Sequence, residues 1–193
     1  DTIINVIGNL TSKSYADITL DIIKDFGVNV KNESYSRFLI SAGQTYRATN
    51  YAVEADWSSA SYFLAAAAIT EGEVTLTGLN PDSVQGDAGF LDVLEQMGCA
   101  IERSPEKIFI KGNPLRGINI NMNSMPDVVQ TLAVTALFAK SETFISGIRN
   151  LRIKETDRIG ALKQELSRLG ASIDTGEDFL KIRPGTYVPA DIE

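Results

Sequence analysis

Hydrophobic positions along this chain fall into three blocks that share one order of elements. In each block an apolar helix-type pattern ends at a glycine and is followed by an apolar strand pattern. The three glycines are Gly27, Gly98 and Gly170, about 71 residues apart. A glycine after the last helical turn is typical of a left-handed C-terminal cap. Two short apolar stretches around a polar turn come next, which predicts a β-hairpin in every block.

The front half of the block repeats as well. From Asp56 and again from Asp127, an aspartate precedes an alanine-rich helix pattern, a turn with a glutamate and an alternating strand. A second helix follows, and in the last block its apolar residues share one face: Ile159, Leu162, Leu166 and Leu169. The predicted unit is β-α-β-α-β-β. We expect it in full at about 51–112 and 117–185, and only as its last strand, helix and hairpin at about 2–43.

The segment Gly43–Asp56 is polar and lacks periodicity at its start, which predicts a domain boundary near residues 50–55. The fold class is α/β (α+β) with repeated units. We expect residues 1–53 to be the C-terminal part of one domain and residues 54–193 to hold two units of a second, both incomplete. The alternative is one compact domain of three units whose first unit is degenerate, and the pattern alone does not separate the two.

Composition narrows the function. The 193 residues are 44% hydrophobic and carry a net charge of -7, which argues against a general nucleic-acid or membrane-surface role. Cys99 is the single cysteine, so no intrachain disulfide can form, and we expect a cytoplasmic location. Without histidine or a CxxC pair, we expect no metal site, and acid–base chemistry must come from Asp, Glu, Lys or Tyr.

The charged segment Asn150–Arg158 (NLRIKETDR) lies between a strand pattern and a helix pattern. We expect the helix to begin near Thr156 as its N-cap, with Asp157 in the first turn. Cations here oppose the helix dipole, so Arg152, Lys154 and Arg158 favour an anion-binding pocket. The alternative is a solvated turn that neutralises itself.

Two other segments present polar groups at predicted helix starts. Asp127 follows Pro126 in a first turn, either as a stabilising acid or as a carboxylate aimed at a ligand hydroxyl. Thr11, Ser12 and Ser14 open an earlier helix, where hydroxyls bind a phosphate or simply cap the helix. Cys99 reads as a buried small hydrophobe rather than a nucleophile.

Four segments carry a resemblance to a known family: SKSYADITL, EADWSSASYFLAAAAI, MNSMPDVVQTLAVTALFA and NLRIKETDRIGALKQELSRLGA. Together they closely resemble the 5-enolpyruvylshikimate-3-phosphate synthases, over essentially the whole chain. The pairing of KETDR with MPD distinguishes this family from the sister transferase that acts on UDP-N-acetylglucosamine.

The resemblance implies a fold of two domains, each an inverse β-α barrel of three such units. It implies transfer of the enolpyruvyl group of phosphoenolpyruvate to the 5-hydroxyl of shikimate 3-phosphate, through a tetrahedral adduct and with release of phosphate. This reaction belongs to the shikimate pathway of aromatic amino-acid biosynthesis. No cofactor is implied. The expected partners are the two substrates and the rest of a longer chain, with no nucleic acid and no membrane, in a monomer.

The resemblance also implies residue roles. Asp127 matches a carboxylate at the 4- and 5-hydroxyls and is a candidate base. Glu155 matches a carboxylate that moves a proton at the phosphoenolpyruvate methylene, and Lys154 matches a lysine between the two substrates. The remaining matches are substrate-binding positions: Ser12, Tyr15, Asn150, Arg158 and, with a less defined role, Asp56.

Because the resemblance covers only part of a family chain, we expect little or no turnover by this piece alone. Two other functions stay open from the sequence. One is a non-catalytic ligand-binding or interaction fragment of the same fold. The other is enolpyruvyl transfer to UDP-N-acetylglucosamine, in which a cysteine would be the acid.

Overall fold

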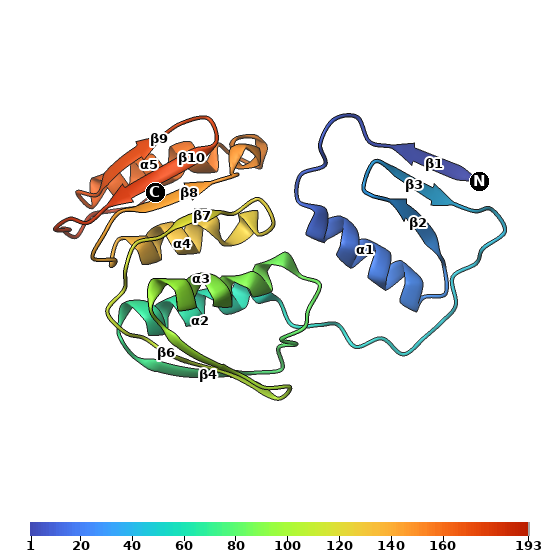
Figure 1. Cartoon of the computed structure of the whole chain (residues 1–193), viewed down its shortest axis with the longest axis horizontal. Helices are drawn as coiled ribbons and strands as arrows, with labels where there is room; N and C mark the ends of the chain where they lie inside the picture. Colours follow the sequence, from blue (N-terminus) through green and yellow to red (C-terminus); the bar gives the residue numbers. More distant parts are fainter. Residues whose placement is uncertain (193) are drawn as a thin grey trace.

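The computed structural model describes residues 1–192, and its first 43 residues form a separate layer pair that we call the N-terminal unit (Figure 1). Helix α1 (Lys13–Asp25) lies beside a three-stranded antiparallel sheet. Strand β3 (Arg37–Ile40) is central in this sheet. The edge strands β1 (Thr2–Asn5) and β2 (Val30–Glu33) pair with it on either side. Every residue of α1 remains at least partly exposed.

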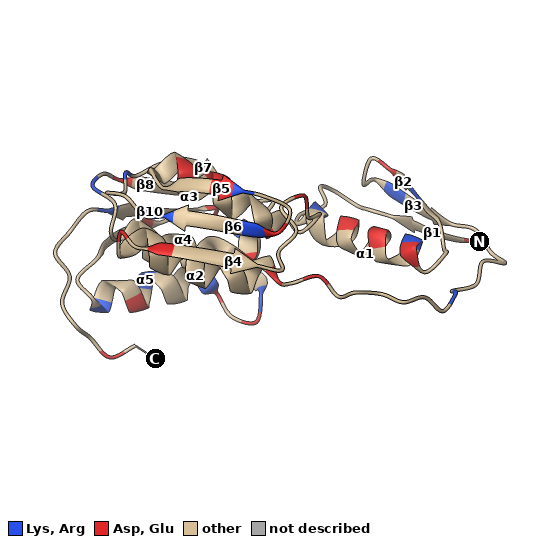
Figure 2. Ribbon diagram, turned by 90° about the horizontal axis from the view of Figure 1, so that it is seen from below, with Lys and Arg blue, Asp and Glu red and all other residues tan. Residues whose placement is uncertain are grey.

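Residues 44–56 form neither helix nor strand within the described chain and run as an extended link to the rest of the molecule (Figures 1 and 2). The opening strand predicted for the unit at 51–112 is therefore wrong. A strand needs a neighbouring strand for its backbone groups, but here a side-chain amide bonds one carbonyl of the link and the first N–H of α2. Gln85 Nε2 donates to the carbonyl of Ala55 at 2.9 Å, and Gln85 Oε1 accepts from the N–H of Trp57 at 3.1 Å.

The main body, residues 57–183, contains two consecutive units. In the first, β6 lies between β4 and β5 in an antiparallel sheet. Its elements are α2 (Trp57–Ile69), β4 (Glu73–Thr77), the 3-10 turn η1 (Gly86–Gly89), α3 (Phe90–Met97), β5 (Ala100–Arg103) and β6 (Lys107–Lys111).

The second unit of the main body matches the predicted β-α-β-α-β-β order in full. Its sheet runs β7-β8-β10-β9, with β7 parallel to β8 and the other pairs antiparallel. Its elements are β7 (Asn119–Asn121), η2 (Pro126–Val128), α4 (Val129–Ala136), β8 (Thr143–Ser146), η3 (Arg149–Ile153), α5 (Arg158–Arg168), β9 (Ser172–Thr175) and β10 (Phe179–Arg183).

The repeat glycines and hairpins are confirmed. Gly27, Gly98 and Gly170 have φ of 85°, 117° and 86°, the left-handed region expected of a helix C-terminal cap. Each is followed by an antiparallel hairpin, β2–β3, β5–β6 and β9–β10. The sequence pattern therefore predicted correctly where the helix ends and the hairpin begins in each block.

One hydrophobic cluster joins both units of the main body. Helices α2 and α4 pack against each other, and the hydroxyls of Ser61 and Thr131 meet at 3.0 Å in their buried interface. The cluster extends from Trp57 to Ile182, and Cys99 is buried in it, as expected. Of the described helices, none is long and apolar enough to cross a membrane.

Candidate functional site

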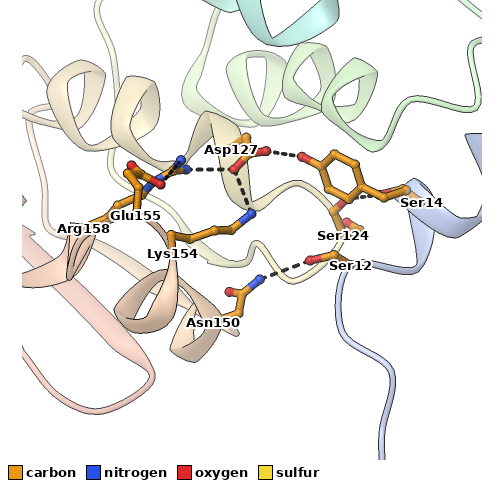
Figure 3. Close-up of polar contacts among 9 residues, drawn as sticks. Ser12, Ser14, Ser124, Asp127, Asn150, Lys154, Glu155 and Arg158 are labelled. Carbon is orange, nitrogen blue, oxygen red and sulfur yellow. Dashed lines mark hydrogen bonds and ion pairs between the residues drawn. The ribbon is translucent and has the colours of Figure 1, made fainter. Parts of the chain in front are cut away.

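The start of α1 meets the main body beside Asp127, and this junction holds the polar site (Figure 3). Asp127 Oδ2 accepts a hydrogen bond from the Tyr15 hydroxyl. Asp127 Oδ1 accepts from Arg158 Nη1 at 2.8 Å and lies 3.3 Å from Lys154 Nζ. One carboxylate thus links α1, the end of η3 and the start of α5. Asp127 lies in the turn that leads into α4, as predicted.

Opposing effects set the ionisation of Asp127. Burial raises the pKa of this carboxyl, but the Tyr15 hydrogen bond and the positive charges of Lys154 and Arg158 outweigh burial and hold its pKa below the ordinary value. Burial, the hydrogen bond to Asp127 and the nearby charge of Asp87 raise the pKa of Tyr15. At neutral pH the pair is therefore a neutral phenol that donates to an ionised carboxylate.

The helix after the charged segment begins one residue later than predicted. The N-cap of α5 is Asp157, not Thr156, and Asp157 Oδ1 accepts from the N–H of Gly160 at 3.0 Å. Asp157 also receives Arg152 Nη1 at 2.7 Å. A carboxylate can accept both bonds at once and gains from the helix dipole as well, whereas a threonine hydroxyl cannot pair with the arginine.

The cations of this segment divide into two groups. Arg152 faces the β9–β10 hairpin, where it donates to the carbonyls of Gly176 and Glu177, so its role is structural. Arg158 is held on one side by both oxygens of Glu155, at 2.7 and 2.8 Å, and on the other by Asp127. The segment is neutralised, as the solvated-turn alternative requires. However, the carboxylate that neutralises Lys154 comes from another element, which a turn alone would not need.

Hydroxyls at the start of α1 connect the two parts rather than cap the helix. Ser12 has φ of 54° in the left-handed region, and its hydroxyl accepts from Asn150 Nδ2 at 3.1 Å. Ser14 Oγ donates to the carbonyl of Ser124 at 3.1 Å. The plain-cap interpretation is therefore wrong for both serines. Asn150 Oδ1 is buried without a hydrogen-bond partner among the described residues, which leaves an acceptor for a ligand.

Asp56 belongs to the same junction. It is the N-cap of α2, where its carboxylate accepts from the N–H groups of Ser58 and Ser59 at 2.9 and 3.2 Å. It also lines a cavity of about 270 Å³ with Tyr15, Asp87 and Asp127. The eight predicted site residues thus surround one junction: Ser12, Tyr15, Asp56, Asp127, Asn150, Lys154, Glu155 and Arg158.

Comparison with known proteins shows which family the chain belongs to. Residues 2–193 match the family model of EPSP synthase (3-phosphoshikimate 1-carboxyvinyltransferase). The chain belongs to the EPSP synthase family. The resemblance inferred from the four sequence segments is confirmed.

Individual relatives of the EPSP synthase family agree. The 3-phosphoshikimate 1-carboxyvinyltransferase of Sulfurovum sp. (strain NBC37-1) is 50% identical over 185 residues, which are 95% of this chain and 43% of the relative. That of Yersinia pseudotuberculosis (strain YPIII) is 48% identical over 191 residues, 98% of this chain and 45% of the relative. The chain therefore spans less than half the length of these curated relatives.

Solved structures confirm the enolpyruvyl transferase fold. EPSP synthase from Acinetobacter baumannii superimposes with a TM-score of 0.77 at 27% identity, over 96% of this chain and 43% of that one. The enolpyruvyl transferase NikO from Streptomyces tendae gives a TM-score of 0.67 at 18% identity, over 91% of this chain and 41% of that one, and supports the fold alone.

The sequence did not single out two residues next to this junction. Asp87 lines the cavity beside Asp127, and Gln85 holds the link before α2. Their local signal was a Gln-Gly-Asp stretch just before a helix pattern, which by itself reads as an ordinary turn. Within residues 1–192, no group of three or more side chains is arranged to hold a metal ion.

Proposed function

We propose that this chain is part of a 3-phosphoshikimate 1-carboxyvinyltransferase, which moves the enolpyruvyl group of phosphoenolpyruvate to the 5-hydroxyl of shikimate 3-phosphate. The observation that carries the proposal is the environment of Asp127. This ionised carboxylate accepts from the neutral Tyr15 phenol on one side and faces Lys154 and Arg158 on the other. A base for a hydroxyl lies beside cations for two anionic substrates.

The reaction requires two kinds of proton transfer. In the addition step the 5-hydroxyl oxygen bonds to C2 of phosphoenolpyruvate, the hydroxyl proton leaves and the methylene carbon gains a proton. In the elimination step the bond from C2 to the phosphate oxygen breaks, phosphate departs and the new methyl group loses a proton. Groups in different environments can share these tasks.

Named residues fit these tasks. Asp127 or Lys154 takes the hydroxyl proton. Glu155, which is largely exposed and oriented by Arg158, serves the methylene carbon. Arg158 binds the carboxylate of phosphoenolpyruvate. When the substrates bind, the ion pairs that the cations of the site now make with acidic side chains are replaced by ion pairs with the substrates. Positioning of the two anions supplies much of the rate advantage.

The other proposed substrate-binding residues lie at the junction of the N-terminal unit and the main body. Ser12, Tyr15 and Asn150 contact shikimate 3-phosphate, with the free acceptor of Asn150 available to a donor on the ligand. Asp56 lies beside the crossover and keeps a less defined role in substrate binding.

The domain division is part of the proposal. We infer that residues 1–53 and 54–193 belong to two domains whose cleft is the active site. The single hydrophobic cluster from Trp57 to Ile182 supports this division, because it includes nothing from the N-terminal unit. The proposed partner is the remainder of a longer chain in a cytoplasmic monomer, and this piece alone should show little turnover. Phosphate release by it, abolished in Lys154→Ala, would contradict that expectation.

The test is a titration of shikimate 3-phosphate into this chain, followed by backbone amide shifts. We expect the shifts to cluster at Asp127, Asn150 and Lys154, and to be lost in Asp127→Asn. Asp82→Asn is the matched control, because Asp82 is an exposed acid on a loop outside the site. A folded sample without such shifts contradicts a preformed half-site. A response to UDP-N-acetylglucosamine instead would indicate the sister reaction.

A further inference from the structure

Asp87 is a buried carboxylate that the proposed reaction does not yet use. It lies in η1, its residue is 9% exposed, and it lines the 270 Å³ cavity with Asp56 and Asp127. Within residues 1–192, its carboxylate has no hydrogen bond or ion pair, and its oxygens reach the open cavity, since they are not among the fully buried side-chain atoms that lack a partner. Buried carboxylates ordinarily have such partners, since an isolated buried charge is strongly unfavourable.

The other two acids of the cavity are compensated. Asp127 has Tyr15, Lys154 and Arg158, and Asp56 has the N–H groups at the start of α2. Asp87 shares the cavity lining with these same acids and with Tyr15, and the positive charge of Lys154 also acts on it. On the adjacent helix α3, the acids pair away from the cavity with one arginine: Asp92 and Glu95 with Arg103.

Burial, followed by the negative charges of Asp127 and Asp56, raises the pKa of Asp87 to about 6, against a smaller opposing effect of Lys154. This carboxyl therefore exchanges its proton close to neutral pH. Coupling between two titrating groups is reciprocal, so the charge on Asp87 must in turn favour the protonated form of Asp127.

The backbone keeps Asp87 at the cavity. On one side of it, Gln85 is fixed by bonds to Glu54, Ala55 and Trp57. A Cβ atom on Gly86 would lie 2.1 Å from the carbonyl oxygen of Ser124 and 2.8 Å from Ser14 Oγ, so the turn is in close contact with both parts of the molecule. The carboxylate therefore has little freedom to withdraw toward solvent.

We propose that Asp87 is a positioning residue of the site, whose charge sets how readily Asp127 accepts a proton. When Asp87 is ionised, its charge repels that of Asp127 and makes Asp127 the stronger base. When Asp87 is protonated, this repulsion is removed. The relevance to enolpyruvyl transfer rests on the function proposed above, whereas the coupling is a property of this chain alone.

The test is a pH titration of the aspartate carboxyl carbons by NMR. In the unaltered chain we expect Asp87 to titrate near pH 6, with a second inflection of the Asp127 signal at the same pH. In Asp87→Asn that inflection should disappear, whereas the main midpoint of Asp127 should stay unchanged, because Asp87 is already protonated and uncharged at the lower pH where Asp127 titrates. Asp82→Asn removes an exposed charge from the same loop and should leave both signals unchanged.

An ordinary low midpoint for Asp87, or an Asp127 signal that ignores Asp87→Asn, overturns the proposal. If Asp87→Asn fails to fold, the second inflection of Asp127 in the unaltered chain decides alone. The shikimate 3-phosphate titration is scored separately. Binding without coupling retains the proposed function and rejects the role of Asp87, and coupling without binding does the reverse.

Discussion

The N-terminal unit and the main body are built from the same predicted block, yet they are held together differently. In the N-terminal unit, Val28 and Phe38 are the buried apolar side chains among the described residues. The main body has one continuous cluster, with fully buried residues such as Trp57, Leu132 and Ile145. Because buried apolar area dominates stability, the main body should be the stable frame. The N-terminal unit delivers Ser12 and Tyr15 to that frame through polar contacts.

The largest expected effect tests the core of the main body. Leu132→Ala removes a fully buried side chain from α4 and should lower the free energy of unfolding by about 2–5 kcal/mol. Ile22→Ala, on the partly exposed face of α1, should change it by less than about 1 kcal/mol. Urea unfolding followed by amide NMR signals from each of the two parts measures both changes. Equal losses would remove the contrast between the two parts.

Next in size is an expected gain in stability. Asp87→Asn replaces a buried carboxyl whose pKa folding raises to about 6. As pH rises from the unfolded pKa of about 4 through the folded value, the unfolded state ionises first, so the native carboxyl destabilises the fold. The variant should therefore be more stable at pH 7 by about 1–3 kcal/mol and no more stable below about pH 4. Urea midpoints at both pH values measure this, and an equal gain at both would contradict the explanation by charge.

A third variant tests how closely the two parts meet. Gly86→Ala would bring a Cβ atom against the carbonyl oxygen of Ser124 and the side chain of Ser14. We expect a loss of about 1–3 kcal/mol from the strain of overpacking, together with faster amide exchange at the start of α1. Gly185→Ala, whose nearest neighbour would be Tyr187 at 3.4 Å, is the control. Unchanged exchange at α1 would show that the junction does not depend on this turn.

The smallest expected effect concerns one hydrogen bond across the junction. Tyr15→Phe removes the donor to Asp127 and should cost about 1 kcal/mol. It should also raise the pKa of Asp127, because that hydrogen bond holds the value down. The stability that Asp127 contributes above its unfolded pKa would then be lost at a higher pH on acidification. Carboxyl NMR measures the shift. Tyr35→Phe, whose hydroxyl binds Asp17 within the N-terminal unit, should leave Asp127 unchanged.

Local patterns predicted the repeat well, because helix ends, glycine caps and hairpins depend on neighbouring residues. The hairpins after Gly27, Gly98 and Gly170 needed no knowledge of distant contacts. The predicted strand before Asp56 failed for the opposite reason. Its backbone is held by Gln85, a side chain about 30 residues away, and no periodicity signals such a bond.

The site shows the same limit. The charged residues were visible in the sequence, but their pairing was not, since Tyr15 and Asp127 are separated by 112 positions. Ser12 looked like a cap and instead meets Asn150 across the junction. Asp87 was overlooked because its proposed role depends on its burial beside other acids, which is a property of the folded molecule only.

The hydrogen bonds between Gln85 and the end of the link have a mechanical consequence. Once the junction contacts of Ser12, Ser14 and Tyr15 have been released, tension on the N-terminal unit passes along residues 44–56 and reaches this one amide where the link joins helix α2. The two hydrogen bonds to the backbone of Ala55 and Trp57 then resist the load, as one pair of hydrogen bonds between neighbouring β-strands would. Under force the link should detach at Gln85 while both sheets stay intact, so that the N-terminal unit pivots on a short tether instead of unravelling.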